Sequence, residues 1–287
     1  MLKISTEIAS AAKIIGEEKA VEYFAKAGFD AWDFSMFNMA QWDWENNCIL
    51  EDNHPLRGDR YLEFARKLKR IGRDNGIECN QSHAPFPVMK KEIHSYLKRA
   101  IECTAEAGGK ICIIHPDNDS SPEKNAEMYF ELLPFAKDCG VKIATENMWN
   151  WNNEKDCPAP AACSDPESFN AHLDAVNDDY FVACLDLGHA EMKGLGTSAE
   201  EMILKLGDRL AALHIHDNDR WHDSHQIPFS MDIDFDKIVA ALKKIKYKGY
   251  FTLEASYYLN NYNKENVFDG IKNLSAAVRK LADMFEK

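Results

Sequence analysis

Long apolar runs and positive charge are both scarce in this sequence. No stretch reaches the roughly 18 consecutive apolar residues of a membrane-spanning helix, and residues 1–5, MLKIS, do not open a signal-peptide apolar region. We therefore expect a cytoplasmic protein with no membrane partner. The chain has 34 lysines and arginines against 47 aspartates and glutamates, a formal net charge of −13, and no basic run. Such a surface repels phosphate backbones, so we expect no nucleic-acid partner.

Cysteine pairs and a phosphate loop are also missing. The eight cysteines include no CxxC pair, and several lie inside apolar runs such as residues 110–114, KICII. Reduced cysteines of a protein core are distributed in this way, so we do not expect a disulfide framework. No glycine-rich loop follows the first predicted strand, which makes a doubly wound, dinucleotide-binding sheet the weaker of two α/β alternatives.

The sequence does have a regular alternation of short apolar runs and amphipathic segments. The predicted strands are residues 2–5, 31–34, 77–81, 110–114, 141–145, 181–185, 210–213 and 250–253. The predicted helices are residues 16–27, 57–75, 90–107, 122–139, 165–176, 198–206, 235–245 and 264–285, several of them followed by the glycine that often ends a helix. Strand–helix units repeated in this way over 287 residues predict an α/β fold, a (β/α)₈ TIM barrel of one domain over residues 1–287.

The densest cluster of chemically active residues is the segment 213–225, LHIHDNDRWHDSH. In a strand, the alternation of side chains places His214 and His216 on the same face. Four histidines beside three aspartates indicate a metal site or a reaction, although hydrogen-bonded surface residues are the alternative at this point.

Six consecutive predicted strands end in a side chain that can bind a metal. These residues are His83, His115, Glu146, Asp186, His214 and Glu254. Catalytic residues of TIM barrels lie where strands end, so the six are expected to converge at one end of the barrel. A set of Glu, Asp, His and Glu offers mostly oxygen ligands, which suits one divalent ion of Mn²⁺, Mg²⁺ or Co²⁺ and tolerates Zn²⁺.

Four short motifs resemble those of the xylose isomerase-like TIM-barrel superfamily, which contains sugar isomerases, ketose 3-epimerases and apurinic endonucleases. They are residues 146–147 (EN), 184–189 (CLDLGH), 214–217 (HIHD) and 252–254 (TLE), and with them the resemblance spans nearly the whole chain. It implies that Glu146, Asp186, His214 and Glu254 hold the metal. His214 is preferred to His216 because the family's ligand precedes an acidic residue by three positions, here Asp217.

The isomerase and epimerase branches imply a small carbohydrate substrate and an enediolate mechanism. Glu146 and Glu254 would donate and accept the proton. Residues implied to contact the substrate are His83, His115, His189, His216, Arg220 and Trp149. A contact that orients Asp186 is the alternative for His189, and a loop salt bridge is the alternative for Arg220. The aromatic segments 36–44 and 149–151 could cover a sugar, or instead form lid packing or a subunit contact in a homo-oligomer.

Two departures from the epimerase pattern and one rival function accompany this resemblance. Asn152 stands where the epimerases have another glutamate, and residues 229–231, FSM, replace a Gly-x-Gly. The rival is a trinuclear-zinc apurinic endonuclease, for which His83, His115, His189, Asp223 and His225 would be additional ligands. A sugar-binding barrel without catalysis is the third alternative, and it would leave both glutamates without a role.

Overall fold

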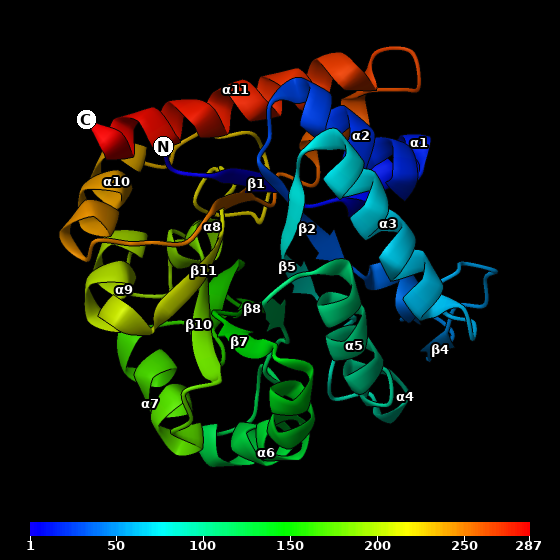
Figure 1. The fold of residues 1–287 in the computed structure, drawn as a ribbon. Helices are drawn as coiled ribbons and strands as arrows, with labels where there is room; N and C mark the ends of the chain where they lie inside the picture. Colours follow the sequence, from blue (N-terminus) through cyan, green and yellow to red (C-terminus); the bar gives the residue numbers. More distant parts are fainter.

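Eight parallel strands form a closed ring in the computed structural model, which describes residues 1–287 (Figure 1). They are β1 (Ile4–Thr6), β2 (Ala31–Ser35), β5 (Glu78–His83), β6 (Ile111–Ile113), β7 (Lys142–Glu146), β10 (Phe181–Asp186), β11 (Leu210–His214) and β12 (Phe251–Leu253). Six of them pair in the order β11-β10-β7-β6-β5-β2, and β1 pairs with β12. Single bridges from Glu7 to Asp33 and from Ile215 to Leu253 join the two sheets. The predicted (β/α)₈ barrel is therefore confirmed.

Helices surround the ring, and every predicted helix is present. They are α2 (Glu17–Ala27), α3 (Tyr61–Asn75), α4 (Lys91–His94), α5 (Leu97–Ala107), α6 (Pro122–Cys139), α7 (Pro166–Val176), α9 (Ala199–Leu206), α10 (Phe235–Lys244) and α11 (Val267–Glu286). The predicted helix 90–107 is interrupted between α4 and α5, and the one expected from residue 57 begins at Tyr61 because turns occupy the residues before it. None of the helices combines the length and apolar character needed to cross a membrane.

Several short elements were not predicted. The helices α1 (Ala9–Ile15) and α8 (Leu187–Ala190) follow β1 and β10, and three 3₁₀ turns are η1 (Phe37–Met39), η2 (Gly207–Arg209) and η3 (Tyr258–Asn261). The two aromatic segments form antiparallel hairpins, one of β3 (Trp42–Asp43) with β4 (Cys48–Ile49) and one of β8 (Trp149–Asn152) with β9 (Cys157–Pro160). All except η2 lie in loops that follow the carboxyl ends of barrel strands, so they surround that end of the barrel.

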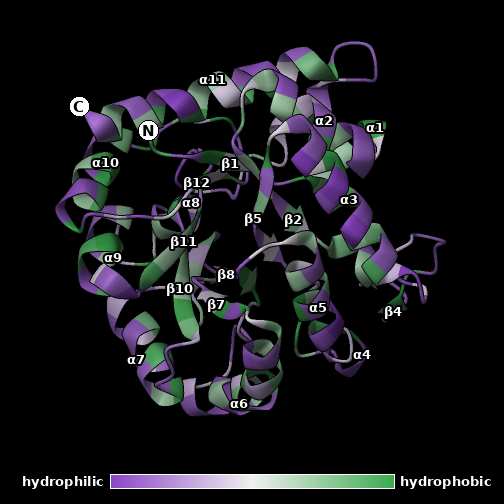
Figure 2. Cartoon of the chain, in the orientation of Figure 1, coloured by the Kyte–Doolittle hydropathy of each residue, from purple (hydrophilic) through white to green (hydrophobic).

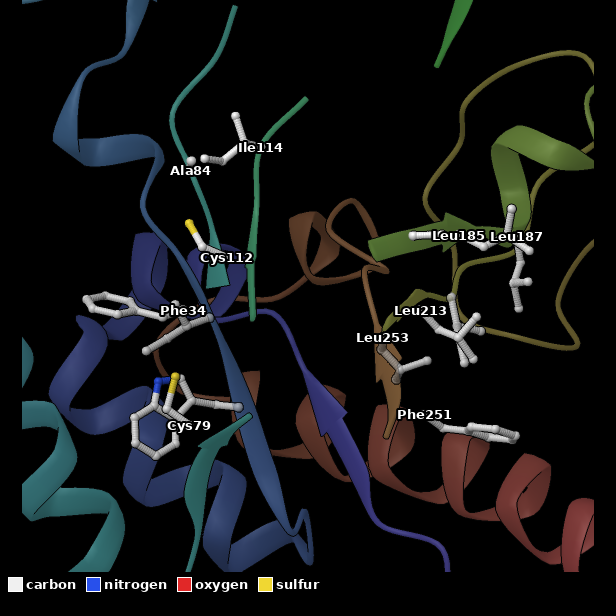
Figure 3. Packing of buried hydrophobic residues seen from close by; sticks show 14 of the residues in the cluster. Phe34, Cys79, Ala84, Cys112, Ile114, Leu185, Leu187, Leu213, Phe251 and Leu253 are labelled. Atoms are coloured by element: carbon white, nitrogen blue, oxygen red, sulfur yellow. The ribbon is translucent and has the colours of Figure 1, made fainter. Parts of the chain in front are cut away.

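The main core lies between the strands and the helices. The helices carry hydrophobic and hydrophilic residues on different faces (Figure 2), and one cluster of 66 buried residues fills the layer between them and the sheet. Figure 3 shows part of this cluster, with Phe34, Cys112, Leu185, Leu213 and Leu253 contributed by five different strands. Burying a side chain of this size contributes about 1.5–3 kcal/mol, so this layer supplies most of the driving force for folding.

The inside of the barrel is divided between an apolar and a polar half. Ile113, Ala144, Cys184 and Ala212 form a small separate cluster from four adjacent strands. On the other half the buried side chains are polar, and Asn80 accepts a hydrogen bond from Ser5 at 2.7 Å and donates to Thr252 at 3.0 Å. On β7, β10 and β11 the next inward position lies two residues beyond this apolar cluster, at the carboxyl end of the barrel.

We predict that Gly72→Ala destabilises the protein although it improves helix propensity. A Cβ at Gly72 in α3 would lie 2.4 Å from the buried ring of Trp32 on β2. Overpacking of this kind costs about 1–3 kcal/mol and outweighs the gain of roughly 0.5–1 kcal/mol from replacing a helical glycine. The measurement is the free energy of unfolding in urea. Gly58→Ala is the matched control, because nothing lies within 4 Å of its Cβ position; equal stability of the two variants would contradict the close α3–β2 contact.

Candidate metal centre

The structure brings the six strand-end residues together at the carboxyl end of the barrel. Glu146, Asp186 and His214 are the last residues of β7, β10 and β11, and all three are buried. Each follows by two positions a small residue of the inner apolar cluster, so strand alternation turns its side chain inward. The other three residues are His83 at the end of β5, His115 after β6 and Glu254 directly after β12.

His214 and two glutamates form the middle of this group. Nδ1 of His214 lies 2.9 Å from Oε1 of Glu146 and 3.5 Å from Oε2 of Glu254. Its Nε2 lies 3.2 Å from Oδ2 of Asp33, a buried carboxylate on β2 that also accepts a hydrogen bond from Gln81 at 2.9 Å. The carboxylate of Asp33 accepts the Nε2–H of His214, and Nδ1 therefore faces the glutamates.

The second oxygen of Glu146 meets two more histidines. Nε2 of His115 lies 3.2 Å and Nε2 of His83 lies 3.5 Å from Oε2 of Glu146. The Nδ1–H of His83 donates to the carbonyl oxygen of Ala84 at 3.0 Å. Because that carbonyl can only accept, the lone pair of the neutral His83 ring lies on Nε2 and points toward Glu146. The carboxylate of Glu146 is thus shared among three imidazoles.

A second group of ligands lies beside the first. Oδ2 of Asp223 lies 3.0 Å from Nε2 of His225 and 3.4 Å from Nε2 of His189. Oδ1 of Asp223 lies 3.4 Å from Nε2 of His216, which is also 3.1 Å from Oδ1 of Asp186. His216 therefore links the second group to the first.

Backbone carbonyls orient the two outer histidines of the second group. The Nδ1–H of His225 donates to the carbonyl oxygen of Glu254 at 2.6 Å, and that of His189 donates to the carbonyl oxygen of Asn147 at 2.9 Å. In the neutral form, each ring therefore carries its lone pair on Nε2, the atom that faces Asp223. Histidines that bind metals are commonly held by such a bond on the other nitrogen.

Gly188 makes the position of His216 possible. A Cβ at residue 188 would lie 2.0 Å from Cε1 of the His216 ring, so any side chain there would displace the ring. With glycine in place, the His216 ring stacks on His225 with centroids 4.0 Å apart and planes 20° apart.

Four buried polar atoms in these groups have no hydrogen-bond partner. They are Oε2 of Glu146, Oδ2 of Asp186, Oδ1 of Asp223 and Nε2 of His216. An unsatisfied buried polar atom costs about 1–3 kcal/mol. Two ligands on one tetrahedral zinc ion, with bonds of about 2.0–2.2 Å, lie about 3.3–3.6 Å apart, which is close to the nitrogen–oxygen separations seen here. The residues therefore fit divalent cations.

Two sets of four residues are close enough together for each set to bind one cation. One ligand atom from each of Glu146, Asp186, His214 and Glu254 lies within 4.8 Å of the others, and the same is true of His189, His216, Asp223 and His225. The first set has three carboxylates and one imidazole, whereas the second has three imidazoles and one carboxylate. A histidine-rich set favours zinc over magnesium or manganese.

Burial and mutual contact shift the pKa values of the site in opposite directions. Burial raises the pKa of Asp186, but the neighbouring charges of His189 and His216 outweigh it and hold the pKa at about 2. Burial, reinforced by the charge of His83, lowers the pKa of His115 to about 4. Burial raises the pKa of Glu254, with His214 opposing this effect. Burial lowers the pKa of His225, but the charge of Asp223 outweighs it and raises the pKa to about 10. A cation bound by this ring would displace a proton, because metals bind neutral imidazole and ionised carboxylate.

Asp217 fixes the long loop between β11 and α10. Its carboxylate accepts hydrogen bonds of 2.9–3.1 Å from the backbone N–H groups of Asn218, Ser230, Met231 and Ile233. Its backbone also pairs with Gln226. The bulky residues that replace Gly-x-Gly are thereby tied to the barrel, and the loop presents Asp223 and His225 to the second group.

A cavity of about 390 Å³ opens over both groups. Its walls include the polar residues His83, His115, Glu146, His189, Asp223, His225 and Glu254 and the aromatic residues Phe37, Phe86, Trp149 and Tyr257. Lys13 is the one lysine or arginine among them. A cavity of this size, with several aromatic walls and converging polar groups, suits a small polar ligand such as a monosaccharide.

Some predicted site residues do not line this cavity. The guanidinium of Arg220 lies 3.3 Å from Oε2 of Glu191 and donates to the carbonyl oxygen of Glu191 at 3.3 Å. Arg220 therefore forms the loop salt bridge that was the alternative to a substrate contact. His216 lies buried between the two groups. In the aromatic segments only Phe37 and Trp149 reach the cavity, whereas Trp151 stacks on His222 and Trp44 is 67% exposed.

Sequence reasoning missed Asp33 and the cavity residues Lys13, Ser256 and Tyr257. The sequence places Asp33 on a predicted strand, where its side chain could point inward, and this is the only feature that could have marked it as a site residue. Its partner His214 lies 181 residues away, so the sequence does not show that the two meet. Lys13 lies on α1, which was not predicted, and the other two belong to the loop after Glu254.

Comparison with known proteins agrees with this architecture. The family model described as "Xylose isomerase-like TIM barrel" matches residues 21–287. The uncharacterized protein MJ1311 of Methanocaldococcus jannaschii is 24% identical, over 88% of this chain and 81% of its own. A D-tagatose 3-epimerase-like protein superimposes with a TM-score of 0.71 at 21% identity, covering 99% of this chain and 98% of its own. The IolI protein with a zinc atom gives a TM-score of 0.71 at 17% identity, covering 99% of each chain. With its barrel and nearly its whole length matched, the chain belongs to the xylose isomerase-like TIM barrel family.

Proposed function

We propose that this protein is a divalent-metal-dependent sugar isomerase or epimerase that transfers a proton at a carbon next to a carbonyl group. The observation that carries the proposal is the position of Glu146 and Glu254, which contact the same nitrogen of His214 at 2.9 and 3.5 Å and line the same cavity. The two carboxylates come from strands three places apart around the barrel. A substrate between them can lose a proton to one and regain it from the other.

Glu146, Asp186, His214 and Glu254 would hold the ion. When bound, a divalent ion supplies Lewis-acid polarisation of the substrate carbonyl, which makes the neighbouring C–H more acidic. Mn²⁺, Mg²⁺, Co²⁺ and Zn²⁺ all accept such a ligand set, and the zinc-containing IolI structure supports zinc as a candidate. Asp33 would keep the Nδ1 of His214 directed at the ion through its contact with Nε2.

The aromatic residues of the cavity would bind the apolar face of a sugar and exclude water. Phe37 packs edge to face on His83 with centroids 4.9 Å apart, and Phe86 lies 5.1 Å from His115. Trp149 faces His189 from the β8–β9 hairpin. The epimerase and epimerase-like structures that share this fold support a carbohydrate substrate.

A second candidate function is a trinuclear-zinc phosphodiesterase acting on abasic DNA. The observation that favours it is the gathering of His189, Asp223 and His225 in a second group, together with the contacts of His83 and His115 to Glu146. The net charge of −13 weighs against it, because a nuclease must neutralise several phosphates. The sugar reaction requires only the first ligand set.

We expect one tightly held divalent ion per chain in protein purified without chelators. The first ligand set is sufficient for the proposed reaction and presents three carboxylates to the cation. Elemental analysis against protein concentration provides the measurement. Three zinc ions per chain, together with incision of abasic duplex DNA that Glu146→Gln abolishes, would replace the isomerase with the phosphodiesterase.

We expect Glu146→Gln and Glu254→Gln each to lower substrate-dependent exchange of carbon-bound hydrogen with solvent deuterium by about 10²–10⁴-fold, because each removes a proton-transfer group. The measurement is NMR of a ketose and aldose panel in D₂O, with the metal content of each variant determined in parallel. His83→Ala should be milder. Exchange at the wild-type rate in both glutamine variants would eliminate the two-glutamate mechanism.

We expect Asp33→Asn to weaken metal binding by about 10–100-fold, the usual effect of removing a carboxylate that orients a metal-binding histidine. Competition with a chelator measures this affinity directly and does not depend on knowing the substrate. Asp269→Asn, which changes an exposed carboxylate paired only with Lys272, is the control. Equal metal affinity of the two variants would show that Asp33 does not orient His214.

A further inference from the structure

We propose that the substrate carries an anionic group, a phosphate monoester or a carboxylate, and that Lys13 binds this group at the mouth of the cavity. The inference rests on the proposed function and specifies its substrate class. It follows from the position of Lys13, from the surrounding charge and from the free hydroxyl groups nearby.

Lys13 reaches the cavity from α1, the short helix that follows β1 at the catalytic end of the barrel. Ala9, Ser10 and Lys13 all line the cavity. Lys13 follows Ala9 by four residues and Ser10 by three, which places it on the same face of the helix as both. Lys13 is the one lysine or arginine in the cavity wall, which otherwise contains Glu146, Asp223 and Glu254 as its charged carboxylates.

A second, basic hollow adjoins the cavity at Lys13. It is lined by residues 12–16 together with Lys19, Tyr23 and Lys264, so three lysines of separate segments meet there. None of the three forms an ion pair. The nearby carboxylates of α2 pair elsewhere: Glu17 contacts His54 and Glu18 contacts Lys67. The local positive charge is therefore left uncompensated, in a chain whose net charge is −13.

Neutral hydrogen-bond donors lie on the same side of the cavity. Ser256 and Tyr257 line it from the loop after Glu254, the loop that continues through η3 to Lys264, and η3 contacts α1. The tyrosine is 50% exposed. A lysine with adjacent hydroxyl groups is a suitable environment for phosphate or carboxylate oxygens.

The distribution of charge in the cavity also determines how an anionic substrate would be oriented. The carboxylates Glu146 and Glu254 repel an anionic group, whereas Lys13 attracts it. An anionic sugar would therefore enter with its charged end toward α1 and its carbonyl end toward the metal centre. Three lysines at one edge provide too little basic surface to follow the several phosphates of a DNA duplex, so a small molecule is the favoured ligand.

The test compares binding of matched ligands to the metal-loaded protein by calorimetry. The ligands are ketopentoses and ketohexoses, their terminal phosphates and the corresponding sugar acids, which separate phosphate from carboxylate recognition. In the wild type we expect the best anionic sugar to bind at least about tenfold more tightly than its neutral counterpart. Lys13→Ala should reduce this ratio by about 10–100-fold, as expected for loss of a charged hydrogen bond, whereas Lys13→Arg should retain most of it.

Lys142→Ala is the matched control, because Lys142 is an exposed lysine at the opposite end of the barrel, on the first residue of β7. The proposal is overturned if no anionic sugar binds more tightly than its neutral form, or if the preference survives Lys13→Ala. It is also overturned if abasic duplex DNA, and no sugar, binds in a manner that depends on Lys13. Lys13-dependent binding of an anionic sugar without turnover of any sugar would support the anion site and contradict the isomerase proposal.

Discussion

The burial of several carboxylates at one end of the barrel is the constraint on which the site depends. Glu146, Asp186 and Glu254 are removed from water by the strands that carry them, and an isolated buried carboxylate is strongly unfavourable. Imidazoles offset this cost, and most of the contacting rings are aimed by a hydrogen bond on the other nitrogen, as His214 is aimed by Asp33. The arrangement remains incomplete without cations, because buried oxygens such as Oε2 of Glu146 have no hydrogen-bond partner.

Most of the barrel could be predicted from the sequence because its strands and helices have strong local periodicity. The strand 181–185 was placed within one residue of β10, and residues 122–139 match α6. The missed elements lack such a signal. The β8–β9 hairpin pairs the sequence WNWN with CPAP, which contains two prolines, so its strands depend on one another and on the barrel below. The helix α1 has only seven residues, too few to show a periodic pattern.

The candidate site was predictable to the extent that it follows from strand ends. Glu146, Asp186 and His214 were recognised because a barrel directs such residues inward at its carboxyl end. Contacts between distant segments were not predictable in this way. Asp33 has no local feature that distinguishes it from a structural aspartate, and Arg220 has the expected spacing but turns to Glu191 instead. Spacing along the chain fixes where a backbone position lies, while loop conformation decides where a long side chain points.

The pairing of β1 with β12 has a consequence for biosynthesis. It joins residues 4–6 to residues 251–253, and Glu254 follows immediately. During translation the ring stays open until β12 has left the ribosome tunnel, because β12 is the strand that pairs with the free edges of β1 and β11. The nascent chain therefore exposes unpaired strand edges until β12 has formed. The proposed ligand set is likewise incomplete until Glu254 has emerged, so the nascent barrel would bind a cation only after its last strand has joined the ring.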